Sequence, residues 1–446
     1  MKRVVSVFLI LCLLIVAACS NNEPPQSEIV QEPNNYSDAV RDAPEEVEET
    51  RPLRPITIEG TLPSGIAYAD LEPFVNEFFR ENEHLLAAFS VSVFVDDYIL
   101  LDSNFGFVGG TAPDFEILNS PDAVFHWAGA TKSLVYVSAM QLYERGLLDL
   151  NADIRNYLPD DMITIHADSD PVTMLHLMNQ TSGLMTDRTV DSGQSLWSDE
   201  TADYFDLGNY LMSLGLYQSF FGTGEVWMPN YIATALAGYV VETISGASFY
   251  EYVNANIFEP LGMTHTSLSP GLADNPIVRA QWEKNRLIRF WMDGSMTLHV
   301  GEPLTAFERE MFSIFPAVGA YGTISDLQRF VKALLPDENG YSPLFEHSET
   351  LAKMFSVSHE PPGSMGLPRV IRHGFTDENP ALGWTAPDET LQIGYGGVGP
   401  FGFTYFIADI DNGIGLVFMS NVDISGVFTP GQALFFSEVV KLVFGE

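Results

Sequence analysis

Lys132 is the first candidate in this sequence for a residue that takes part in nucleophilic or acid–base chemistry. It lies in residues 125–133 (FHWAGATKS), between the hydroxyl side chains of Thr131 and Ser133. An amine beside a hydroxyl can take its proton during acyl transfer, and an amine of lowered pKa is itself a nucleophile. Hydroxyl groups on a helix more often hydrogen-bond to the nearby backbone, so a structural role is the simpler interpretation of both.

Other motifs of chemical interest have simpler explanations. Residues 397–402 match G-x-G-x-x-G, but a dinucleotide fingerprint opens a helix, and here a strand and a hairpin follow. Residues 409–413 begin like a calcium loop, but the apolar run after them supplies no later acidic ligand. The nine histidines are scattered without metal-binding spacing. The sequence therefore predicts no metal site and no cofactor, and no G-x-S-x-G motif indicates the other common hydrolase architecture.

The composition is that of a large, acidic, globular chain. It has 446 residues, of which 46% are apolar and 18% charged, so it can bury a sizeable core. The 59 acidic and 21 basic residues give a net charge of -38. Because nucleic-acid affinity depends on Lys and Arg neutralising phosphates, this charge argues strongly against nucleic-acid partners. It also argues against binding of anionic membranes through protein side chains.

The two cysteines, Cys12 and Cys19, both lie in an N-terminal segment typical of secretion signals. Two basic residues precede an apolar run over residues 4–18, which is short for a membrane span and suits a signal-peptide core. Small residues stand directly before Cys19, which resembles the lipobox of bacterial lipoproteins. We therefore predict a signal peptide over residues 1–18 and lipidation of Cys19. The mature protein would be an extracytoplasmic bacterial lipoprotein that contacts the membrane through its lipid only; the alternative is an ordinary secretory signal with an incidental cysteine.

Residues 19–56 are rich in Pro, Glu and Asn, which predicts a disordered acidic tether before a folded domain over residues 57–446. At the start of that domain, one apolar stripe through Leu71, Phe74, Val75, Phe78 and Phe79 predicts an amphipathic helix. The alternating residues 89–93, a turn and the apolar residues 98–101 predict a hairpin.

A helix over residues 131–145, apolar on every side and closed by Gly146, is predicted to be central and buried. Helical patterns dominate the middle of the chain, including residues 231–244. Residues 403–410 and 414–420 flank an Asp-Asn-Gly turn and predict a second hairpin, before a last helix that begins at Thr429 and Pro430. This order predicts an α/β (α+β) fold, an antiparallel sheet built from the N- and C-terminal segments and flanked by helices. A mostly helical subdomain would be inserted over roughly residues 150–315.

The folded part resembles the serine hydrolase family of class C β-lactamases and D-alanyl-D-alanine carboxypeptidases, which includes penicillin-binding-protein-like members. The resemblance covers about residues 60–446 and implies a β-lactamase/transpeptidase-like fold. Its most specific stretches are residues 125–133, 140–159, 172–175, 179–184, 235–246, 257–263 and 322–327.

The resemblance also implies where the family's chemistry would lie. In the family a serine three residues before a helical lysine attacks the substrate, and a Lys or His followed by x-Gly on an edge strand shapes the oxyanion side of the pocket. Lys132 matches the lysine, and burial on its helix should lower its pKa. The nucleophile position falls on Gly129, which has no side chain, and the Lys or His position falls on Tyr395.

The family's tyrosine, from a Tyr-x-Asn segment, acts as the partner base or acid. Two registers are open for it. Without a gap the tyrosine falls on Pro229 and the asparagine on Tyr231, whereas a shift of one residue places them on Met228 and Asn230. Neither register supplies the tyrosine, so Lys132 alone remains of the residues that move protons.

We therefore expect a surface-anchored pseudoenzyme whose cleft could bind a cell-wall (peptidoglycan) peptide, a small acyl compound or a partner protein. One alternative is that Tyr395, Met228 and Trp227 simply fill the pocket. The other is an active serine-type hydrolase of the β-lactamase, carboxypeptidase or esterase class with a rerouted nucleophile. The candidates for that nucleophile are Ser133, Thr131, Ser182 and the amine of Lys132.

Overall fold

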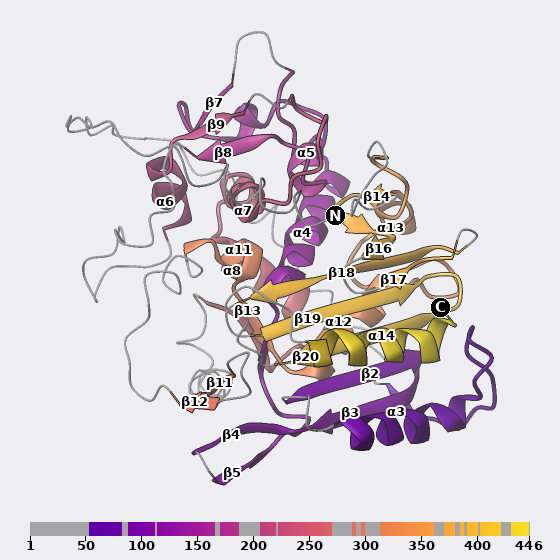
Figure 1. The fold of residues 1–446 in the computed structure, drawn as a ribbon. Helices are drawn as coiled ribbons and strands as arrows, with labels where there is room; N and C mark the ends of the chain where they lie inside the picture. The colour runs from indigo at the N-terminus through magenta and orange to yellow at the C-terminus, as the bar shows by residue number, and fades with distance from the viewer. Residues whose placement is uncertain are drawn as a thin grey trace, which may run out of the picture. The chain divides into compact units, whose positions relative to one another are not determined.

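The computed structural model describes fourteen segments of the chain (Figure 1). They are residues 53–82, 88–111, 114–165, 170–186, 206–219, 222–269, 288–290, 296–298, 313–360, 370–379, 384–387, 390–399, 402–420 and 430–445. The predicted signal peptide, Cys12, Cys19 and nearly all of the predicted tether lie outside the described residues, as does Thr429. The predicted domain boundaries therefore stay predictions.

One large sheet is built from both ends of the folded part, as the sequence predicts. Its eight strands run in the order β1-β3-β2-β20-β19-β18-β15-β14. They are β1 (Arg54–Pro55), β3 (Tyr98–Phe105), β2 (Phe89–Val95), β20 (Ile414–Ser420), β19 (Gly402–Asp409), β18 (Gln392–Gly399), β15 (Phe375–Thr376) and β14 (Ile371–Arg372). All neighbours pair antiparallel except β1 with β3, and β2 joins the C-terminal hairpin by pairing with β20. Figure 1 shows the indigo and yellow strands side by side.

Helix α3 (Tyr68–Asn82) and helix α14 (Pro430–Phe444) cover one face of this sheet. Alternate strand residues supply a core rich in phenylalanine, in which the rings of Phe89 and Phe435 lie 4.3 Å apart between centroids. The predicted stripe of α3 is narrower than expected, because Leu71 and Val75 are buried whereas Phe74 is exposed. Phe74 is thus not a core residue, although it stands on the predicted apolar stripe.

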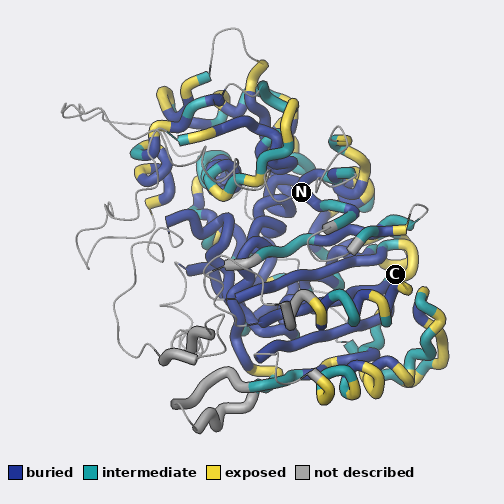
Figure 2. The backbone as a smooth tube through the Cα atoms, in the orientation of Figure 1, coloured by how far each residue is buried: buried dark blue, intermediate teal, exposed yellow. Residues whose placement is uncertain are grey.

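The other face of the sheet carries the larger core, which is centred on helix α4 (Lys132–Glu144). A 3-10 turn, η2 (Ala128–Thr131), leads into this helix, and every residue from Lys132 to Leu142 is buried. Gly146 follows its end with a left-handed φ of 70°, as the sequence predicts. Figure 2 shows the buried backbone around α4 in dark blue.

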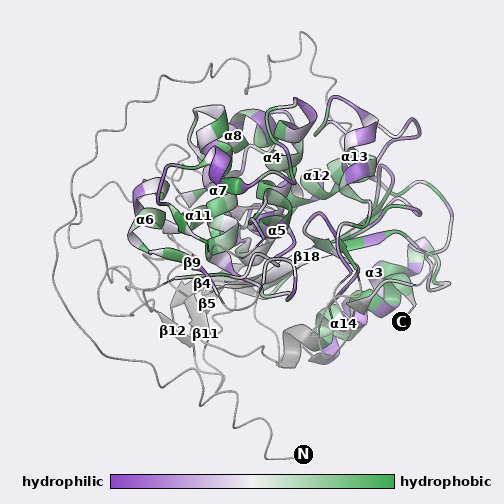
Figure 3. Cartoon of the chain, turned by 90° about the horizontal axis from the view of Figure 1, so that it is seen from above, coloured by the Kyte–Doolittle hydropathy of each residue, from purple (hydrophilic) through white to green (hydrophobic). Residues whose placement is uncertain are grey.

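Further helices pack around α4 on this side. They include α7 (Tyr231–Ser245), α8 (Phe249–Val253), α5 (Met174–Met178), α6 (Leu207–Ser213), α11 (Phe315–Val318), α12 (Ile324–Leu334), the 3-10 turn η3 (Ile154–Tyr157) and the π-helical turn η4 (Asn254–Phe258). Figure 3 shows hydrophobic residues, in green, concentrated in α7 and α11. The other described elements are α13 (Ser348–Met354), β4 (Phe107–Thr111), β5 (Asp114–Leu118), β6 (Phe125–His126), β7 (Ile163–Thr164), β8 (Leu184–Thr186), β9 (Leu216–Gln218), β10 (Thr266–Leu268), β11 (Ile288–Phe290), β12 (Met296–Leu298), β13 (Ala320–Gly322), β16 (Glu378–Asn379) and β17 (Trp384–Thr385).

The glycine-rich motif lies within the sheet. Gly397 and Gly399 lie in β18 and Gly402 begins β19, so the motif spans a hairpin and opens no helix.

In the described part of the chain no single helix is long and apolar enough to cross a membrane. One pair, Tyr231–Ser245 with Phe249–Phe258, has the length and composition together but bends by 81°.

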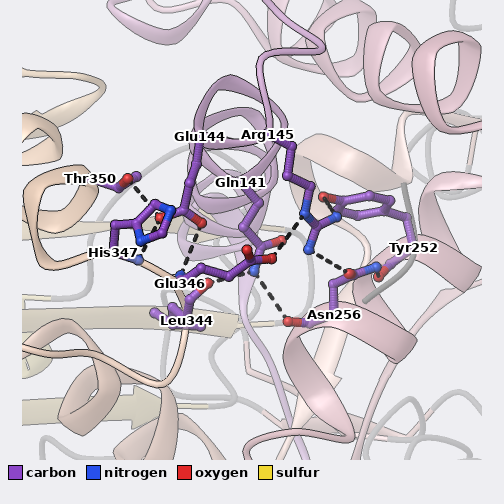
Figure 4. A network of polar contacts seen from close by, with 9 residues as sticks. All are labelled: Gln141, Glu144, Arg145, Tyr252, Asn256, Leu344, Glu346, His347 and Thr350. Atoms are coloured by element: carbon purple, nitrogen blue, oxygen red, sulfur yellow. Dashed lines mark hydrogen bonds and ion pairs between the residues drawn. The ribbon is translucent and has the colours of Figure 1, made fainter. Parts of the chain in front are cut away.

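A polar network holds the C-terminal end of α4 to its neighbours (Figure 4). The side-chain amide of Gln141 donates to the backbone carbonyls of Asn256, at 3.2 Å, and Leu344, at 2.8 Å. The guanidinium of Arg145 donates to the side chain of Asn256 at 3.3 Å and forms an ion pair with Glu346 at 3.6 Å. The end of α4 is thus joined both to η4 and to the segment that leads into α13.

Glu144, on α4, completes this network because its side chain caps the N-terminal end of α13. Its carboxylate accepts hydrogen bonds from the backbone N–H groups of Glu346, at 3.0 Å, and His347, at 2.8 Å, and from the hydroxyl of Thr350, at 2.7 Å. The N-cap residue His347 makes no side-chain capping bond of its own. A carboxylate at a helix N-terminus is favoured both by the free N–H groups and by the helix dipole.

Candidate functional site

At the N-terminal end of α4, the backbone of Gly129 lies directly against strand β18. A Cβ atom added to Gly129 would lie 2.8 Å from the carbonyl oxygen of Gly396 and 3.1 Å from the Cα of Gly397. A Cβ added to Gly397 would lie 2.9 Å from the Cα of Gly129. Such separations are shorter than real Cβ contacts, and the atoms met are backbone atoms that cannot swing aside. The position assigned to the nucleophile therefore has no room for a side chain unless β18 shifts.

Lys132, one turn further on, is a buried cation without a hydrogen-bonding partner in the described part of the chain. Only 5% of its surface is exposed. Its ammonium lies over the ring of Tyr231, 4.4 Å from the ring centroid, which is a cation–π contact. Burial lowers the pKa of the Lys132 ammonium to about 7, because desolvation penalises the charged form. A substantial fraction of the amine is therefore neutral at physiological pH.

Tyr395, at the position assigned to a Lys or His, reaches from β18 to helix α4. Its hydroxyl lies 2.8 Å from the hydroxyl of Tyr136. The side-chain amide of Gln180 donates to the Tyr136 hydroxyl at 3.4 Å. Burial raises the pKa of both tyrosines, that of Tyr395 well above its ordinary value. The two phenols are neutral at any physiological pH, so this position supplies no charge.

Gln180 connects the start of α7 to this cluster. It has a left-handed φ of 59°, which is uncommon for a residue with a Cβ. Its side chain donates to the hydroxyl of Thr234 at 3.0 Å and accepts from the backbone N–H of Asn230 at 2.8 Å. Gln180 thereby sets where α7 begins relative to α4.

The segment assigned to the second motif ends at the N-terminus of α7. The side chain of Asn230 caps that helix by accepting from the N–H of Ile232 at 2.8 Å, and its amide donates to the carbonyl of Leu184, also at 2.8 Å. Its polar atoms are thus used structurally, and Pro229 and Met228 carry no group that transfers protons. Of this segment, Tyr231 is the residue that meets Lys132.

The three hydroxyl groups considered as substitute nucleophiles are buried and hydrogen-bonded to nearby backbone. Ser133 donates to the carbonyl of Ala130 at 2.6 Å. Thr131 accepts from the N–H of Ala320 at 3.2 Å, and Ser182 accepts from the N–H of Leu184 at 3.3 Å. Each bond stabilises a turn or a strand, which supports the structural interpretation of all three.

A comparison with family models identifies the protein family of this chain. The family model named Beta-lactamase matches residues 79–434, which is well over half of the chain. The chain belongs to the Beta-lactamase family. Membership of this family and a mixed α/β fold are what the sequence predicts, and both are confirmed.

Individual relatives are distant. Protein flp of Staphylococcus aureus (strain N315) is 22% identical over 261 residues, which cover 58% of this chain and 47% of that protein. Esterase EstB of Burkholderia gladioli is 27% identical over 328 residues, which cover 69% of this chain and 80% of EstB. This chain thus spans about half the length of Protein flp.

Solved structures show the same fold. The octameric penicillin-binding protein homologue from Pyrococcus abyssi superposes with a TM-score of 0.62 at 19% identity, over 84% of this chain and 77% of that one. At this identity the likeness concerns the fold and not the chemistry.

Sequence reasoning missed two members of this β-lactamase-family site, Tyr136 and Gln180, and the contact that Tyr231 makes with Lys132. Tyr136 lies one helical turn beyond Lys132, so the spacing of four residues could have placed both on one face of α4. Gln180 belongs to a matching stretch, yet nothing local indicated its left-handed backbone. The contact of Tyr231 with Lys132 depends on the packing of α7 against α4 and had no signal in the sequence. In the described segments no group of three or more His, Cys, Asp or Glu residues could hold a metal ion.

Proposed function

We propose that this protein is a noncatalytic, surface-anchored member of the Beta-lactamase family that binds a peptidoglycan peptide or a small acyl compound. The observation that carries the proposal is the contact between Gly129 and strand β18. The position assigned to the attacking serine has neither an oxygen atom nor space for one, because a Cβ there would lie 2.8 Å from the Gly396 carbonyl oxygen. Acyl transfer to a serine cannot begin without that atom.

The state of the remaining groups supports the same proposal. Lys132 forms no hydrogen bond with a hydroxyl in the described part of the chain, so it has no proton to take from a nucleophile. Tyr395 is a neutral phenol whose hydroxyl is engaged by Tyr136. Neither residue can perform the role that the family assigns to its position.

A binding role, as opposed to a filled pocket, is supported by exposed apolar side chains near the start of α7, whose first residue covers Lys132. Tyr231 covers the ammonium and yet 38% of its surface is exposed. Met185 and Val226 are also exposed. In sequence Met185 follows Leu184 and Val226 precedes Asn230 by four residues, and the Asn230 amide donates to the Leu184 carbonyl. Exposed apolar groups gathered around one site are typical of surfaces that bind ligands.

Reactivity is tested by incubating the purified full-length protein with a fluorescent penicillin and, separately, with a chromogenic ester. We expect no covalent label and no hydrolysis above the background of heat-denatured protein, with a catalytically active class C β-lactamase as positive control. Labelling or turnover that disappears in Lys132→Met or Ser133→Ala would show an active hydrolase with a rerouted nucleophile.

Binding is tested by titrating a synthetic peptide that ends in D-alanyl-D-alanine into the protein in a calorimeter. We expect a measurable heat of binding that Tyr231→Ala weakens at least severalfold. Met212→Ala is the matched control, because Met212 is an equally exposed apolar residue on α6. No heat from this peptide or from a penicillin would favour the filled pocket instead.

The anchor is tested separately by Cys19→Ala, which should move the protein from the membrane fraction to the soluble fraction. An unchanged distribution would count against lipidation without bearing on the binding site.

A further inference from the structure

The surroundings of Lys132 are those of a reactive amine and differ from those of a structural lysine. It is buried, and its one contact of note in the described residues is the ring of Tyr231 at 4.4 Å. By comparison, Lys441 has a side chain that is 52% exposed and pairs with Glu438 at 3.8 Å, and Lys332 pairs with Asp97 at 3.2 Å. A lysine in an apolar site without a counter-ion loses the hydration that keeps its amine protonated and unreactive.

The groups that surround this amine leave it free to react. Three ionisable side chains are gathered there, Tyr231 from α7, Tyr136 from α4 and Tyr395 from β18. Burial raises the pKa of each of them, so all three are neutral at pH 7. None of them supplies a charge that would hold the Lys132 ammonium in its protonated form, and burial brings its pKa to about 7.

We infer that Lys132 is a covalent binding site for small, uncharged aldehydes, which its amine captures reversibly as an imine. The nitrogen lone pair forms a bond to the carbonyl carbon, and the carbonyl oxygen takes a proton to give a carbinolamine. That intermediate loses water, so the carbon–oxygen bond is replaced by a carbon–nitrogen double bond and no oxidant or reductant is needed. The proposal goes beyond noncovalent peptide binding and does not depend on it.

The structure favours small and uncharged aldehydes over other carbonyl compounds. The three tyrosines near the amine are neutral, so none of them would pair with the charge of a keto acid or a phosphorylated aldehyde. The ring of Tyr231 lies over the amine and is partly exposed, so a ligand would reach Lys132 past this ring. The ring of Tyr231 would thus shield the amine from solvent, and the apolar surroundings would favour the imine by excluding water.

The test uses propanal at limiting concentration with sodium cyanoborohydride, which transfers hydride to the imine carbon and fixes the adduct as a propylamine. The full-length protein is labelled at pH values from 5.5 to 9 and digested, and each lysine is followed by mass spectrometry; the chain has only six lysines. At pH 7 we expect Lys132 to be labelled on the order of tenfold faster than Lys441. The labelling rate of Lys132 should reach half of its maximum near pH 7. Labelling of Lys132 no faster than Lys441 in the folded protein would overturn the proposal.

Two variants of Tyr231 separate burial of the amine from other causes. Tyr231→Phe keeps the ring and should preserve both the rate and the half-maximal pH. Tyr231→Ala admits water to the amine, so the half-maximal pH should rise and the preference for Lys132 over Lys441 should shrink severalfold. Equal behaviour of the two variants would show that the ring does not control the amine and would also overturn the proposal. Penicillin labelling and peptide binding are measured independently, so failure here is distinguishable from failure of the proposed function.

Discussion

The two ends of helix α4 differ in how completely their polar side chains are partnered. At the C-terminal end, Gln141, Glu144 and Arg145 all hold neighbouring segments through hydrogen bonds or an ion pair. At the N-terminal end, Lys132 is more deeply buried than Glu144 and Arg145, yet among the described residues its polar interaction is a cation–π contact with the ring of Tyr231. The same helix thus carries a hydrogen-bonded network at one end and a buried amine without a hydrogen-bonding partner among the described residues at the other.

The difference between the two ends of α4 indicates which residues the fold needs for its stability. A buried polar group that satisfies its neighbours contributes to stability, whereas a buried cation without a partner costs stability. We expect the fold to be at least as stable without Lys132, which is why we propose a role for it in binding or chemistry. Four variants test this contrast.

The largest effect is expected for Lys132→Met, which should raise the free energy of unfolding by about 3 kcal/mol at pH 6, the ring contact offsetting part of the desolvation cost. The folded-state pKa of about 7 lies below the ordinary value of 10.5. Between these pH values the unfolded chain binds a proton that the folded chain does not, so the wild type gains stability as pH rises. The advantage of the variant should therefore be full below pH 7 and vanish towards pH 10.5.

Urea unfolding at pH 6 and pH 10 measures this difference, with Lys441→Met as the control on the exposed α14 surface. A loss of stability in Lys132→Met, or a gain that does not depend on pH, would contradict the view of Lys132 as an unpartnered cation.

At the opposite end, Gln141→Met should lower the free energy of unfolding by about 2 kcal/mol. The variant keeps the side-chain volume but leaves the carbonyls of Asn256 and Leu344 without their donor. Leu142→Met serves as the control for a volume-conserving change in the same buried turn. If both variants unfold at the same urea concentration, the network does not stabilise the C-terminal end.

Returning to the N-terminal end, Gly129→Ser should lower the free energy of unfolding by about 1.5 kcal/mol, because its Cβ pushes β18 away. The same variant should not hydrolyse penicillin, since Tyr395 still occupies the third position. Gly129→Ala should lose as much stability, which would attribute the loss to the Cβ and not to the hydroxyl. Substantial turnover in Gly129→Ser would mean that the other two motif assignments are wrong.

The smallest effect is expected for Tyr395→Phe, which removes the hydrogen bond to Tyr136 and should cost about 1 kcal/mol. Tyr136→Phe should cost more, because it also removes the acceptor of the Gln180 amide. In a double-mutant cycle the two costs should not add, since both variants break the same bond. Additive costs would show that the two hydroxyls do not interact in solution.

Local patterns in the sequence were sufficient for much of the architecture. Alternation over residues 89–93 and the Asp-Asn-Gly turn predicted the strands β2, β19 and β20, because side-chain period and turn chemistry are properties of neighbouring residues. The mostly apolar run up to Gly146 predicted a buried α4 for the same reason. The width of the α3 stripe was not predictable, since the packing of α3 in the tertiary structure decides whether Phe74 is covered.

The sequence by itself also determined which groups are missing at the candidate site, because the resemblance assigned Gly129 and Tyr395 to positions that need an alcohol and a cation. Only the tertiary structure decided what stands there instead. Three contacts join segments that are far apart in the chain. Strand β18 lies against Gly129, the hydroxyl of Tyr395 pairs with that of Tyr136, and the ring of Tyr231 lies over Lys132. Such contacts follow from how helices and strands pack, and no local pattern encodes them.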